Sequence, residues 1–358
     1  MVRDAIDLNQ IQRVLVTKLR HHGDVLLTSP VFQVLKNHAP HLEIDALVYA
    51  ETMPMLTLHP AIQNVYAIDR AWRSEPFFAR LLREINLYSS LKSRRYDLVV
   101  HLSDSPRGLW IKQLLNIRYG VAPEVPGRPR IGWNRFTHLY SLTKCRHMVE
   151  LNLDALRRIG LHPTPEERHL VLEPGEAAVA SITKLMGEHG LTGKKFIQFH
   201  GGSRWMFKTW PSDRVAALLN QLVSDGFVIV LTGAPDEREM AWIRQVLSLT
   251  HGNIINFAGL LSLKELAALT AQAALFVGVD SAPMHIAAAV GTPVVAIFGP
   301  SNEFDWGPWM VKHRVVTTQH SCRPCGNDGC GGGKISECLT TLPIERVLAA
   351  IREISAPW

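Results

Sequence analysis

The chain alternates twice between short apolar runs rich in β-branched residues and longer segments with helical spacing, and this pattern limits the fold more than any other feature. In the first half, strands are predicted at Val14–Leu19, Ile44–Val48, Val65–Ile68 and Leu98–Leu102, and helices at Ser29–Asn37, Phe77–Lys92, Leu109–Leu115 and Glu150–Ile159. Such a series predicts a mostly parallel sheet covered on both faces. Residues 120–140, rich in Pro, Gly and Arg, are predicted to be irregular loops.

The alternation restarts after a connection at Gly160–Gly175 that contains three prolines. Strands are predicted at Phe196–Phe199, Phe227–Leu231, Ile254–Phe257, Leu275–Val279 and Val294–Phe298, and helices at Ser212–Val223, Asp236–Leu247, Ser262–Ala271, Ala282–Val290 and Leu342–Ile354. We therefore expect an α/β protein with one domain over residues 1–175, a second over 176–341, and a last helix within 342–358. A length of 358 residues fits two domains.

Charge divides the chain unevenly. Residues 1–175 hold 23 basic and 17 acidic side chains, whereas residues 176–358 hold 15 of each. The excess favours an acidic partner for the first half: a phosphorylated substrate, an anionic lipid surface or a nucleic acid. Neutral drift of the surface charge is the alternative. The start of the sequence has no secretory signal pattern, and no apolar stretch approaches 18 residues, so we expect a cytosolic protein with peripheral membrane contact still open.

Several common fingerprints of catalytic sites are missing from the sequence. There is no GxxxxGK[ST] and no GxGxxG after the first strand, which argues against a P-loop ATPase and a typical NAD enzyme. A GxSxG hydrolase motif is also absent. Without an Asp-x-Asp pair, the chain lacks the usual carboxylate clamp for a metal-bound nucleotide sugar. Any diphosphate must be neutralised by other groups.

The first strand leads into Lys18-Leu19-Arg20-His21-His22-Gly23-Asp24. Gly23 allows a tight turn, which places Asp24 at or near a helix N-terminus at the carboxyl end of a strand. A carboxylate there can cap the helix, or it can accept a proton from a hydroxyl nucleophile. Arg20, His21 and His22 are candidates for orienting an acceptor or binding its phosphate, and either histidine is an alternative base.

Two further loops carry donors for an anion. Gly202, Ser203, Arg204 and Lys208 follow the first strand of the second domain, where glycines let backbone N–H groups approach phosphate oxygens. A glycine turn with solvated cations is the alternative. Asp280 and Ser281 end a buried strand, Ala282 and Pro283 open a helix, and His285 lies four residues after Ser281 on the same helix face.

Four motifs, KLRHHGDVLLT at 18–28, KTWP at 208–211, VDSAPMH at 279–285 and FGP at 298–300, together resemble the ADP-heptose:lipopolysaccharide heptosyltransferases, glycosyltransferase family 9. The RHHGD form is most similar to the heptosyltransferase III branch. The resemblance implies a GT-B fold, with two Rossmann-like domains whose parallel sheets face across a cleft. The acceptor binds largely to the first domain and the donor to the second, and the C-terminal helix is expected to pack back toward the first.

The resemblance also implies site roles. Asp24 is expected to be the catalytic base and Lys208 to hold the donor diphosphate. The donor loop falls on Asp280-Ser281-Ala282, where Ser and Ala stand for the family's Thr and Gly. His285, Glu237 and Leu261 match the loop histidine, the acid after the Gly-Ala-Pro turn and an apolar adenine contact. The reaction is then an inverting, metal-independent transfer of heptose from ADP-heptose to the lipopolysaccharide inner core, with no cofactor and no nucleic acid partner.

Two features stay open at this point. Cations interleaved with Trp72, Phe77 and Phe78 form either a patch facing the acceptor or the inner face of the inner membrane, or a solvated helix face: Arg70, Arg73, Arg80, Arg83, Lys92, Arg94 and Arg95. Cys322, Cys325, Cys330 and Cys338 have ligand-like spacing in a Gly-rich loop, so they are either a structural zinc site or free or packed thiols.

Two other functions are compatible with the same donor motifs. A nucleotide-sugar epimerase of GT-B type would use the donor pocket without a lipid acceptor. A non-enzymatic nucleotide-binding scaffold would use the cysteine cluster as a metal module. Transfer, epimerised sugar or binding alone distinguishes the three.

Overall fold

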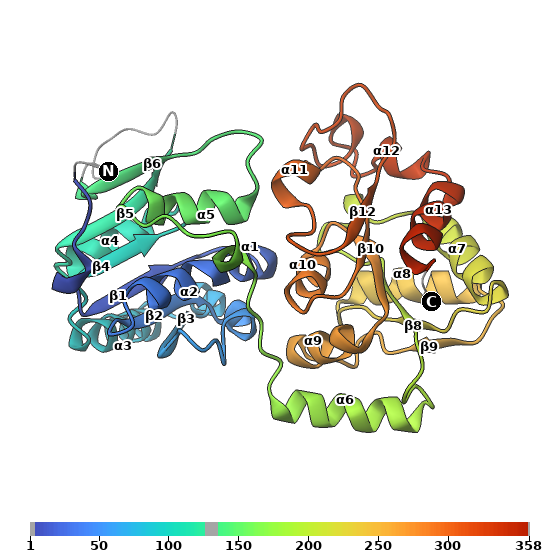
Figure 1. The fold of residues 1–358 in the computed structure, drawn as a ribbon, viewed down its shortest axis with the longest axis horizontal. Coiled ribbons are helices and arrows are strands. Elements are labelled where there is room, and N and C mark those ends of the chain that lie inside the picture. Colours follow the sequence, from blue (N-terminus) through green and yellow to red (C-terminus); the bar gives the residue numbers. More distant parts are fainter. Residues whose placement is uncertain (1–3, 126–134, 357–358) are drawn as a thin grey trace. The chain divides into compact units, whose positions relative to one another are not determined.

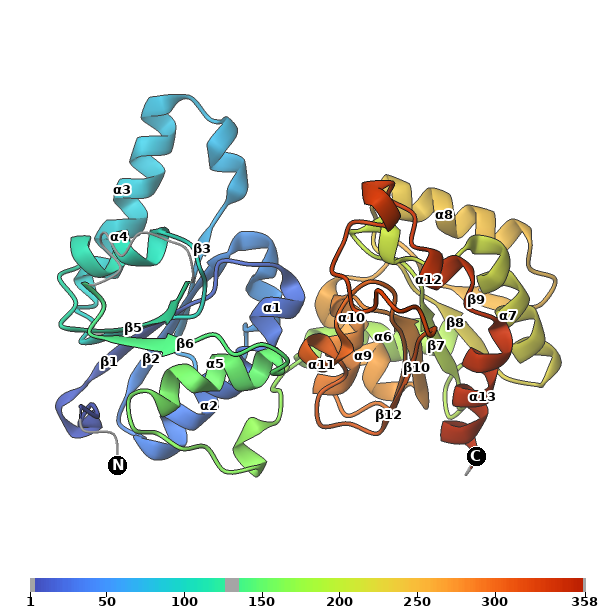
Figure 2. The ribbon, with the colours of Figure 1, turned by 90° about the horizontal axis from the view of Figure 1, so that it is seen from above.

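The computed structural model describes residues 4–125 and 135–356, and the chain divides into two compact units, Met1–Glu173 and Pro174–Trp358. This division falls inside the connection predicted from the prolines at 160–175. Each unit contains one six-stranded parallel sheet with helices on both faces (Figures 1 and 2). The α/β class with two domains is therefore as predicted.

The first unit has the strand order β3-β2-β1-β4-β5-β6. Its strands are β1 Arg13–Thr17, β2 Glu43–Tyr49, β3 Asn64–Ile68, β4 Leu98–His101, β5 Tyr119–Glu124 and β6 His138–Ser141. Its α-helices are α1 His22–Leu26, α2 Ser29–His38, α3 Phe77–Ser93, α4 Arg107–Leu114 and α5 Met148–Arg157. This is the doubly wound order of dinucleotide-binding folds, in which ligands bind where the order reverses, here between β1 and β4.

The second unit repeats that order as β12-β11-β10-β7-β8-β9. Its strands are β7 Ile197–His200, β8 Ile229–Leu231, β9 Ile254–Asn256, β10 Leu275–Val279, β11 Val294–Ile297 and β12 His313–Val316. Its α-helices are α6 Glu176–Glu188, α7 Ser212–Ser224, α8 Glu237–Ser248, α9 Leu263–Gln272, α10 Ala282–Ala289, α11 Glu303–Trp306, α12 Glu337–Thr340 and α13 Ile344–Ser355. The order reverses between β7 and β10, which pair directly.

Local sequence explains where several of these elements begin and end. Ser262 and Glu265 form a capping box at the start of α9: the Ser262 hydroxyl accepts from the Glu265 amide, and the Glu265 carboxylate accepts from the Ser262 amide. Asp236 caps α8 in a similar way by accepting from two first-turn amides. The central strand β10 is buried along its whole length, as its apolar run LFVGV predicts.

The C-terminal helix α13 belongs to the second unit. It contacts α7, β12, β11 and β10, and its apolar face, which includes Val347, Ile351 and Ile354, lies in the same buried cluster as Phe199 and Val277. Its formation is as predicted at Leu342–Ile354. The expected packing against the N-terminal domain stays a prediction.

The structure adds elements that the sequence analysis did not identify. Part of 120–140, predicted to be loop, contains the end of β5 and the start of β6; residues 126–134 of that stretch lie outside the described residues. The strand β12 and the helix α6 were not predicted either. Both β6 and β12 lie at sheet edges, where one side lacks a partner and polar residues are tolerated, so their sequences HLYS and HRVV give a weak strand signal.

Candidate active site

The reversal point of the second sheet brings together Lys208 and Asp280. Lys208 ends a 3-10 turn, Met206–Lys208, in the loop after β7, and Asp280 directly follows the neighbouring strand β10. The Nζ atom of Lys208 lies 2.6 Å from Oδ2 of Asp280, and the two side chains are 22% and 8% exposed. The structure therefore joins two residues that the sequence analysis placed independently in the donor site.

The helix α10 starts next to this ion pair. Ser281 is its N-cap residue with an extended backbone, Ala282 is its first residue, and a proline stands in its first turn. Amide groups in the first turn of a helix have no carbonyl partner within the helix, so this end can receive an anion. His285 is buried at 3% exposure within α10.

The loop after β7 has the glycines for a specific steric reason. A Cβ atom on Gly202 would lie 2.1 Å from Oε1 of Glu239, so any other residue there would displace this buried carboxylate. Ser203 is buried, and its hydroxyl accepts from the amide of Trp205 at 3.3 Å. Arg204 is exposed, with its guanidinium 5.6 Å from the Trp205 ring centroid. This loop is thus held close to α8.

Sequence reasoning selected Glu237 and missed Glu239. Glu237 is exposed at the start of α8, whereas the Glu239 carboxylate is buried, accepts from the Ala234 amide at 2.8 Å and lies 3.5 Å from Nε2 of His200. Burial raises the pKa of Glu239 and lowers that of His200 to about 4. The neutral His200 imidazole and the Glu239 carboxyl group therefore form a buried polar contact, and Gly202 packs against it.

The predicted adenine contact, Leu261, is partly buried and packs against an apolar cluster that contains Phe257 and Leu269. It lies in the loop between β9 and α9. The structure thus gives Leu261 an apolar environment, and its role toward a nucleotide stays a prediction.

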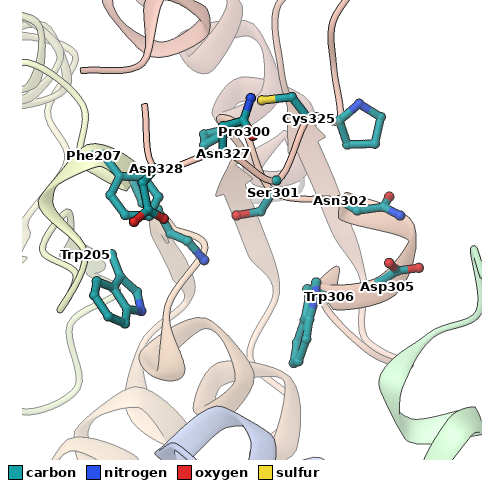
Figure 3. Close-up of a pocket in the computed structure, with 13 residues that line it drawn as sticks. Trp205, Phe207, Pro300, Ser301, Asn302, Asp305, Trp306, Cys325, Asn327 and Asp328 are labelled. Atoms are coloured by element: carbon teal, nitrogen blue, oxygen red, sulfur yellow. The ribbon is translucent and has the colours of Figure 1, made fainter. Parts of the chain in front are cut away.

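A pocket of about 490 Å³ lies beside Lys208 in the second unit. Figure 3 shows Trp205, Phe207 and Trp306 around one space with Ser301. Its walls come from three segments: the Trp205–Lys208 loop, the Pro300–Trp306 turn with α11, and residues 324–328 of the cysteine loop. Sequence analysis singled out the Lys208 loop, the FGP motif that ends at Pro300 and the cysteine run, but not the pocket that they enclose.

The four clustered cysteines are free thiols, three of them exposed and Cys338 buried. Burial raises the pKa of the Cys338 thiol, and the positive charge of Arg323 opposes that rise. Within residues 4–125 and 135–356, no group of three or more His, Cys, Asp or Glu side chains is arranged to hold a metal ion. The structural zinc stays a prediction.

In the first unit, Asp24 lies in the first turn of α1, as predicted. His21 is the N-cap residue, and its amide donates to Oδ2 of Asp24 at 3.4 Å. The carboxylate is partly exposed at the carboxyl end of β1. Asp24 therefore caps α1 and also faces solvent at the reversal point of the sheet. A cap and a proton acceptor are compatible roles for one carboxylate.

Lys18 is the residue of this motif that sequence reasoning left without a role. It is 5% exposed, and its Nζ donates to the Leu102 carbonyl at 2.9 Å and to Oδ1 of Asn152 at 3.1 Å. Burial lowers the pKa of Lys18 to about 8, opposed by attraction to Asp24. Asn152 in turn donates to the Leu27 carbonyl at 2.9 Å, at the end of α1. This chain of contacts positions the helix that carries Asp24.

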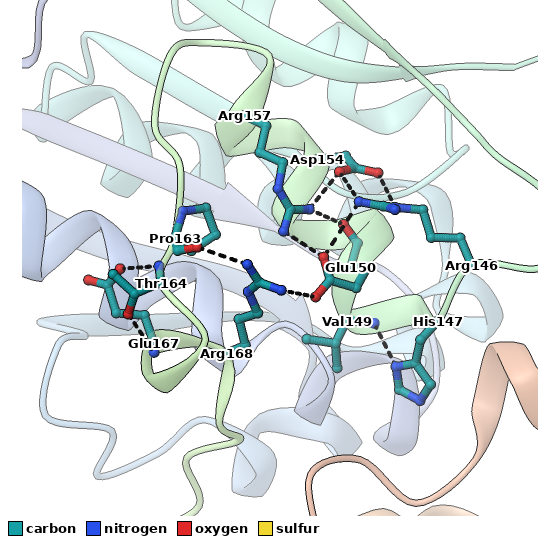
Figure 4. A network of polar contacts seen from close by, with 10 residues as sticks. All are labelled: Arg146, His147, Val149, Glu150, Asp154, Arg157, Pro163, Thr164, Glu167 and Arg168. Carbon is teal, nitrogen blue, oxygen red and sulfur yellow. Dashed lines mark hydrogen bonds and ion pairs between the residues drawn. The ribbon is translucent and has the colours of Figure 1, made fainter.

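The helix α5, which supplies Asn152, is fixed by an ion-pair network (Figure 4). Arg146 and Arg157 both pair with Asp154, and Arg157 and Arg168 both pair with Glu150. Several basic residues of the first half, which has the excess of positive charge, therefore form ion pairs inside their own unit.

The candidate acceptor residues have partners of their own. Arg20 pairs with Asp104 at 2.9 Å, and both side chains are substantially exposed. A ring nitrogen of His22 lies 2.8 Å from the Glu51 carbonyl. Together with His21 at the N-cap, these residues surround the start of α1.

The structure removes one member, Arg94, from the basic patch predicted at 70–95. Arg94 is only 20% exposed and pairs with Asp45 at 2.8 Å and Glu43 at 2.9 Å, so it is a structural residue. Figure 2 shows α3 and the segment before it standing away from the first sheet. The helix α3 exposes a run of large apolar side chains, namely Phe77, Phe78, Leu81, Leu82 and Ile85. Arg80 and Arg83 are exposed on the same helix.

Comparison with known proteins decides the family. The profile of glycosyltransferase family 9 (heptosyltransferase) matches residues 85–335. The chain belongs to this family. Two Escherichia coli proteins named lipopolysaccharide heptosyltransferase 3 are similar to it: one is 33% identical over 81% of this chain and 84% of its own length, and the other, from strain K12, is 31% identical over 94% and 96%.

A solved structure has the same fold. The E. coli ADP-heptose lipopolysaccharide heptosyltransferase II superposes with a TM-score of 0.75 at 21% identity, covering 96% of this chain and 98% of that one. The GT-B class and the glycosyltransferase activity predicted from the motifs are confirmed, and the epimerase and scaffold alternatives are not favoured. The roles of individual family 9 site residues stay predictions.

Proposed function

We propose that this protein transfers a heptose from ADP-heptose to a heptose of the lipopolysaccharide inner core, as a heptosyltransferase III. The Lys208–Asp280 pair beside the start of α10 carries the proposal, because it supplies a cation and helix amides at one reversal point, where a diphosphate can be held without a metal. The similarity to two proteins named heptosyltransferase 3 supports the acceptor class.

The reaction is a single displacement with inversion. The Asp24 carboxylate takes the proton of an acceptor hydroxyl while that oxygen forms a bond to the anomeric carbon of the heptose. The bond from that carbon to the phosphate oxygen breaks, and ADP leaves with the electron pair. Lys208 and the amides at Ser281–Ala282 stabilise the charge that develops on the phosphate. Arg204 is placed in the same loop and is the second candidate cation.

Lys208 changes partner in this scheme. Its ammonium group is paired with the nearly buried Asp280 in the structure. A diphosphate has more negative charge than one carboxylate, so it competes for the same cation. Asp280 then helps to position the donor loop through its backbone, because its amide donates to the Ile297 carbonyl at 3.3 Å.

The first unit is proposed to bind the acceptor and the membrane. Arg20, His21 and His22 adjoin Asp24 and are suited to phosphates of the inner core. The exposed apolar side chains of α3, with Arg80 and Arg83, are suited to an anionic leaflet, and they support the proposal that the enzyme acts at the cytoplasmic face of the inner membrane. Within the described part of the chain, no helix is long and apolar enough to cross a bilayer.

The decisive experiment supplies purified protein with ADP-heptose and a lipopolysaccharide core that lacks the side-branch heptose. Mass spectrometry is expected to show a mass increase of one heptose on the core and release of ADP, with no effect of EDTA. An epimerised ADP-sugar, or binding of the nucleotide without turnover, would overturn the proposal in favour of an epimerase or a scaffold. The Asp24→Asn variant is the negative control.

A further inference from the structure

The buried lysine of the first unit, Lys18, has hydrogen-bond partners but no ion-pair partner. Within residues 4–125 and 135–356, its ammonium group donates to the Leu102 carbonyl and to Oδ1 of Asn152, and no carboxylate lies at ion-pair distance. Burying a charge without an opposite charge is costly, so an apolar side chain of the same length would cost less here. The stability of the fold therefore does not explain why this position is a lysine.

Two carboxylates act on Lys18 from a distance. Burial lowers the pKa of Lys18 to about 8, and attraction to Asp24, and then to Asp104, opposes that lowering. A pKa of about 8 leaves the ammonium group charged at neutral pH. Asp104 is already paired with Arg20 at 2.9 Å, whereas Asp24 forms no ion pair within the described part of the chain. The carboxylate that has no cation of its own is thus the proposed base.

The other charged groups around these two residues are neutral, paired or partly exposed. Burial lowers the pKa of His101 on β4 to about 4, and the charge of Lys18 contributes to that lowering. Glu51, whose 3-10 helix packs against α1, is paired with Arg70 at 3.2 Å. The two histidines of the motif stand at the start of α1 and are partly exposed. Among these groups, Lys18 is the buried cation, so its field is the least weakened by water and salt.

The proposed acceptor makes this field relevant to the reaction. The lipopolysaccharide inner core carries phosphates, and a negative charge placed near a carboxylate favours the protonated carboxyl group. A protonated Asp24 cannot take the proton of the attacking hydroxyl. Binding of the acceptor therefore works against the base. A buried cation that the acceptor cannot displace opposes this effect.

Asn152 links the same lysine to the position of the helix. Its Oδ1 accepts from Lys18 at 3.1 Å, and its Nδ2 donates to the Leu27 carbonyl at 2.9 Å. Leu27 is the C-cap residue of α1, and Asn152 is 2% exposed. A change at Asn152 therefore disturbs the placement of α1 while the charge of Lys18 stays. Substitutions at the two residues separate geometry from charge.

We propose that Lys18 is a positioning residue of the transfer reaction, whose buried charge keeps Asp24 a carboxylate while the anionic acceptor is bound. This inference rests on the proposed function. Lys18 acts through Asp24, and Asn152 holds the helix on which Asp24 stands. The proton taken from the acceptor hydroxyl goes to Asp24, and Lys18 keeps its own proton throughout.

The test compares Lys18→Met and Lys18→Gln, which remove the charge, with Asn152→Ala, which keeps it. Steady-state transfer at saturating ADP-heptose and truncated core gives kcat as a function of pH. In both Lys18 variants, the pH at which kcat falls to half on the acid side should rise by about 0.5–1 unit, the usual size of the effect of one nearby charge inside a protein. Asn152→Ala should lower kcat at every pH with that midpoint unchanged.

Lys36→Met is the matched control. Lys36 is a partly buried lysine of α2 in the same unit, and its ammonium group donates to the Leu42 carbonyl at 2.9 Å. This variant should keep the wild-type kcat and midpoint. ADP-heptose affinity, measured by calorimetry, should stay at the wild-type value in all four variants, because the proposed donor site lies in the other unit. An unshifted acid midpoint in both Lys18 variants would overturn the proposal, whatever their kcat, and would leave Lys18 a structural residue.

Stability provides a readout that does not depend on activity. The pKa of Lys18 is about 8 in the folded protein and 10.5 ordinarily, so between these values the unfolded chain holds a proton that the folded chain has released. The free energy of unfolding of wild type should therefore rise relative to that of Lys18→Met as the pH increases from 8 to 10.5. Parallel curves would show that Lys18 is not a buried charge and would contradict the proposal.

The outcomes separate this inference from the proposed function. A wild-type protein that transfers no heptose contradicts the function itself. A wild-type protein that transfers heptose, together with Lys18 variants whose acid midpoint is unshifted, contradicts only the role of Lys18. Thermal unfolding of each variant shows whether it is folded, and Lys18→Gln, which keeps hydrogen-bond donors at this position, replaces Lys18→Met in the comparison if the latter fails to fold.

Discussion

Lys208 and Asp280 form an ion pair of 2.6 Å across two neighbouring strand ends of the second sheet, although 72 positions separate them in the sequence. Strand order brings the two residues together, because β7 and β10 are neighbours, and their opposite charges form the ion pair. Its two members depend on each other, because a nearly buried carboxylate without its cation is unfavourable. The first prediction concerns the cation of this pair.

Lys208→Ala is expected to weaken ADP binding at least tenfold and to lower kcat/KM for transfer, because the diphosphate loses its main cation. Calorimetry with ADP and a transfer assay measure the two effects. Lys184→Ala, at an 80% exposed lysine of α6, is the control and should change neither. Wild-type ADP affinity in Lys208→Ala would contradict the prediction and would make Arg204 the cation that binds the diphosphate.

Asp24→Asn is expected to lower turnover by roughly 10² or more while ADP-heptose affinity stays within a few-fold, because the amide keeps the shape of the side chain and cannot accept the proton. Rapid-quench or steady-state transfer assays measure the loss. Near-normal turnover would instead make His21 or His22 the base.

Two buried histidines predict how stability depends on pH. Burial lowers the pKa of both His101 and His200 to about 4 from an ordinary value of 6.5. The unfolded chain therefore binds protons between pH 6.5 and 4 that the folded chain excludes, so the free energy of unfolding is fully retained above about pH 6.5 and falls as the pH drops toward 4. Urea unfolding of wild type and His200→Gln over this range should show a shallower fall in the variant; parallel curves would contradict the prediction.

Gly108 in α4 should not tolerate a side chain. A Cβ atom there would lie 2.4 Å from the ring of the buried His101. We expect Gly108→Ala to destabilise the protein by about 1–3 kcal/mol. Gly187→Ala is the matched control in helix α6, where the nearest atom lies 3.9 Å away and alanine should be neutral or stabilising by about 0.5–1 kcal/mol. Equal melting temperatures for the two variants would contradict the steric argument.

The exposed side chains of α3 predict a membrane contact. Phe78 and Leu82 are 76% and 59% exposed, so replacing both by Ser removes apolar surface without disturbing the core. Sedimentation with vesicles containing anionic lipid should show at least a several-fold loss of binding, and ADP binding should be unchanged. Val179→Ser, at an exposed position of α6, is the control. Undiminished vesicle binding would contradict a membrane contact and would support the alternative that α3 is a solvated helix.

Charge on the same helix predicts a salt dependence. Arg80→Glu with Arg83→Glu should raise the acceptor KM, and raising the NaCl concentration should raise it more for wild type than for the variant, because exposed charges are screened beyond about 8 Å at physiological ionic strength. Arg94 is left unchanged since it pairs with buried Asp45. Equal salt sensitivity of the two proteins would exclude an electrostatic role.

The sequence predicts well those features that depend on local pattern. Buried central strands such as β10 have continuous apolar runs, and Asp24, Lys208 and Asp280 stand at strand ends where ligand residues are expected. Edge strands such as β6 have polar, short sequences that resemble loops. The helix α6 starts at Glu176, directly after the predicted connection, in a stretch before Phe196 to which the sequence analysis assigned no element.

Residues whose roles depend on long-range contacts could not be predicted. Lys18 looks like one more cation of a polar motif, and only its bonds to Leu102 and Asn152 show that it is buried. Arg94, at the end of α3, looks like a member of a basic patch because its partners, Glu43 and Asp45, lie far away in sequence on strand β2. The pocket near Lys208 needs the loop at 205–208 together with two segments, 300–306 and 324–328, that come much later in the chain, so no local pattern indicates it.

The helix α13 has a consequence for the order in which the protein forms during synthesis. The first unit is complete in sequence by Glu173, so it can fold while the ribosome is still translating the second half. In the second unit, α13 follows every strand of the sheet it covers and contributes Val347, Ile351 and Ile354 to the buried cluster. The nascent second sheet therefore keeps an apolar face uncovered until α13 leaves the exit tunnel, and apolar surface exposed in this interval favours aggregation.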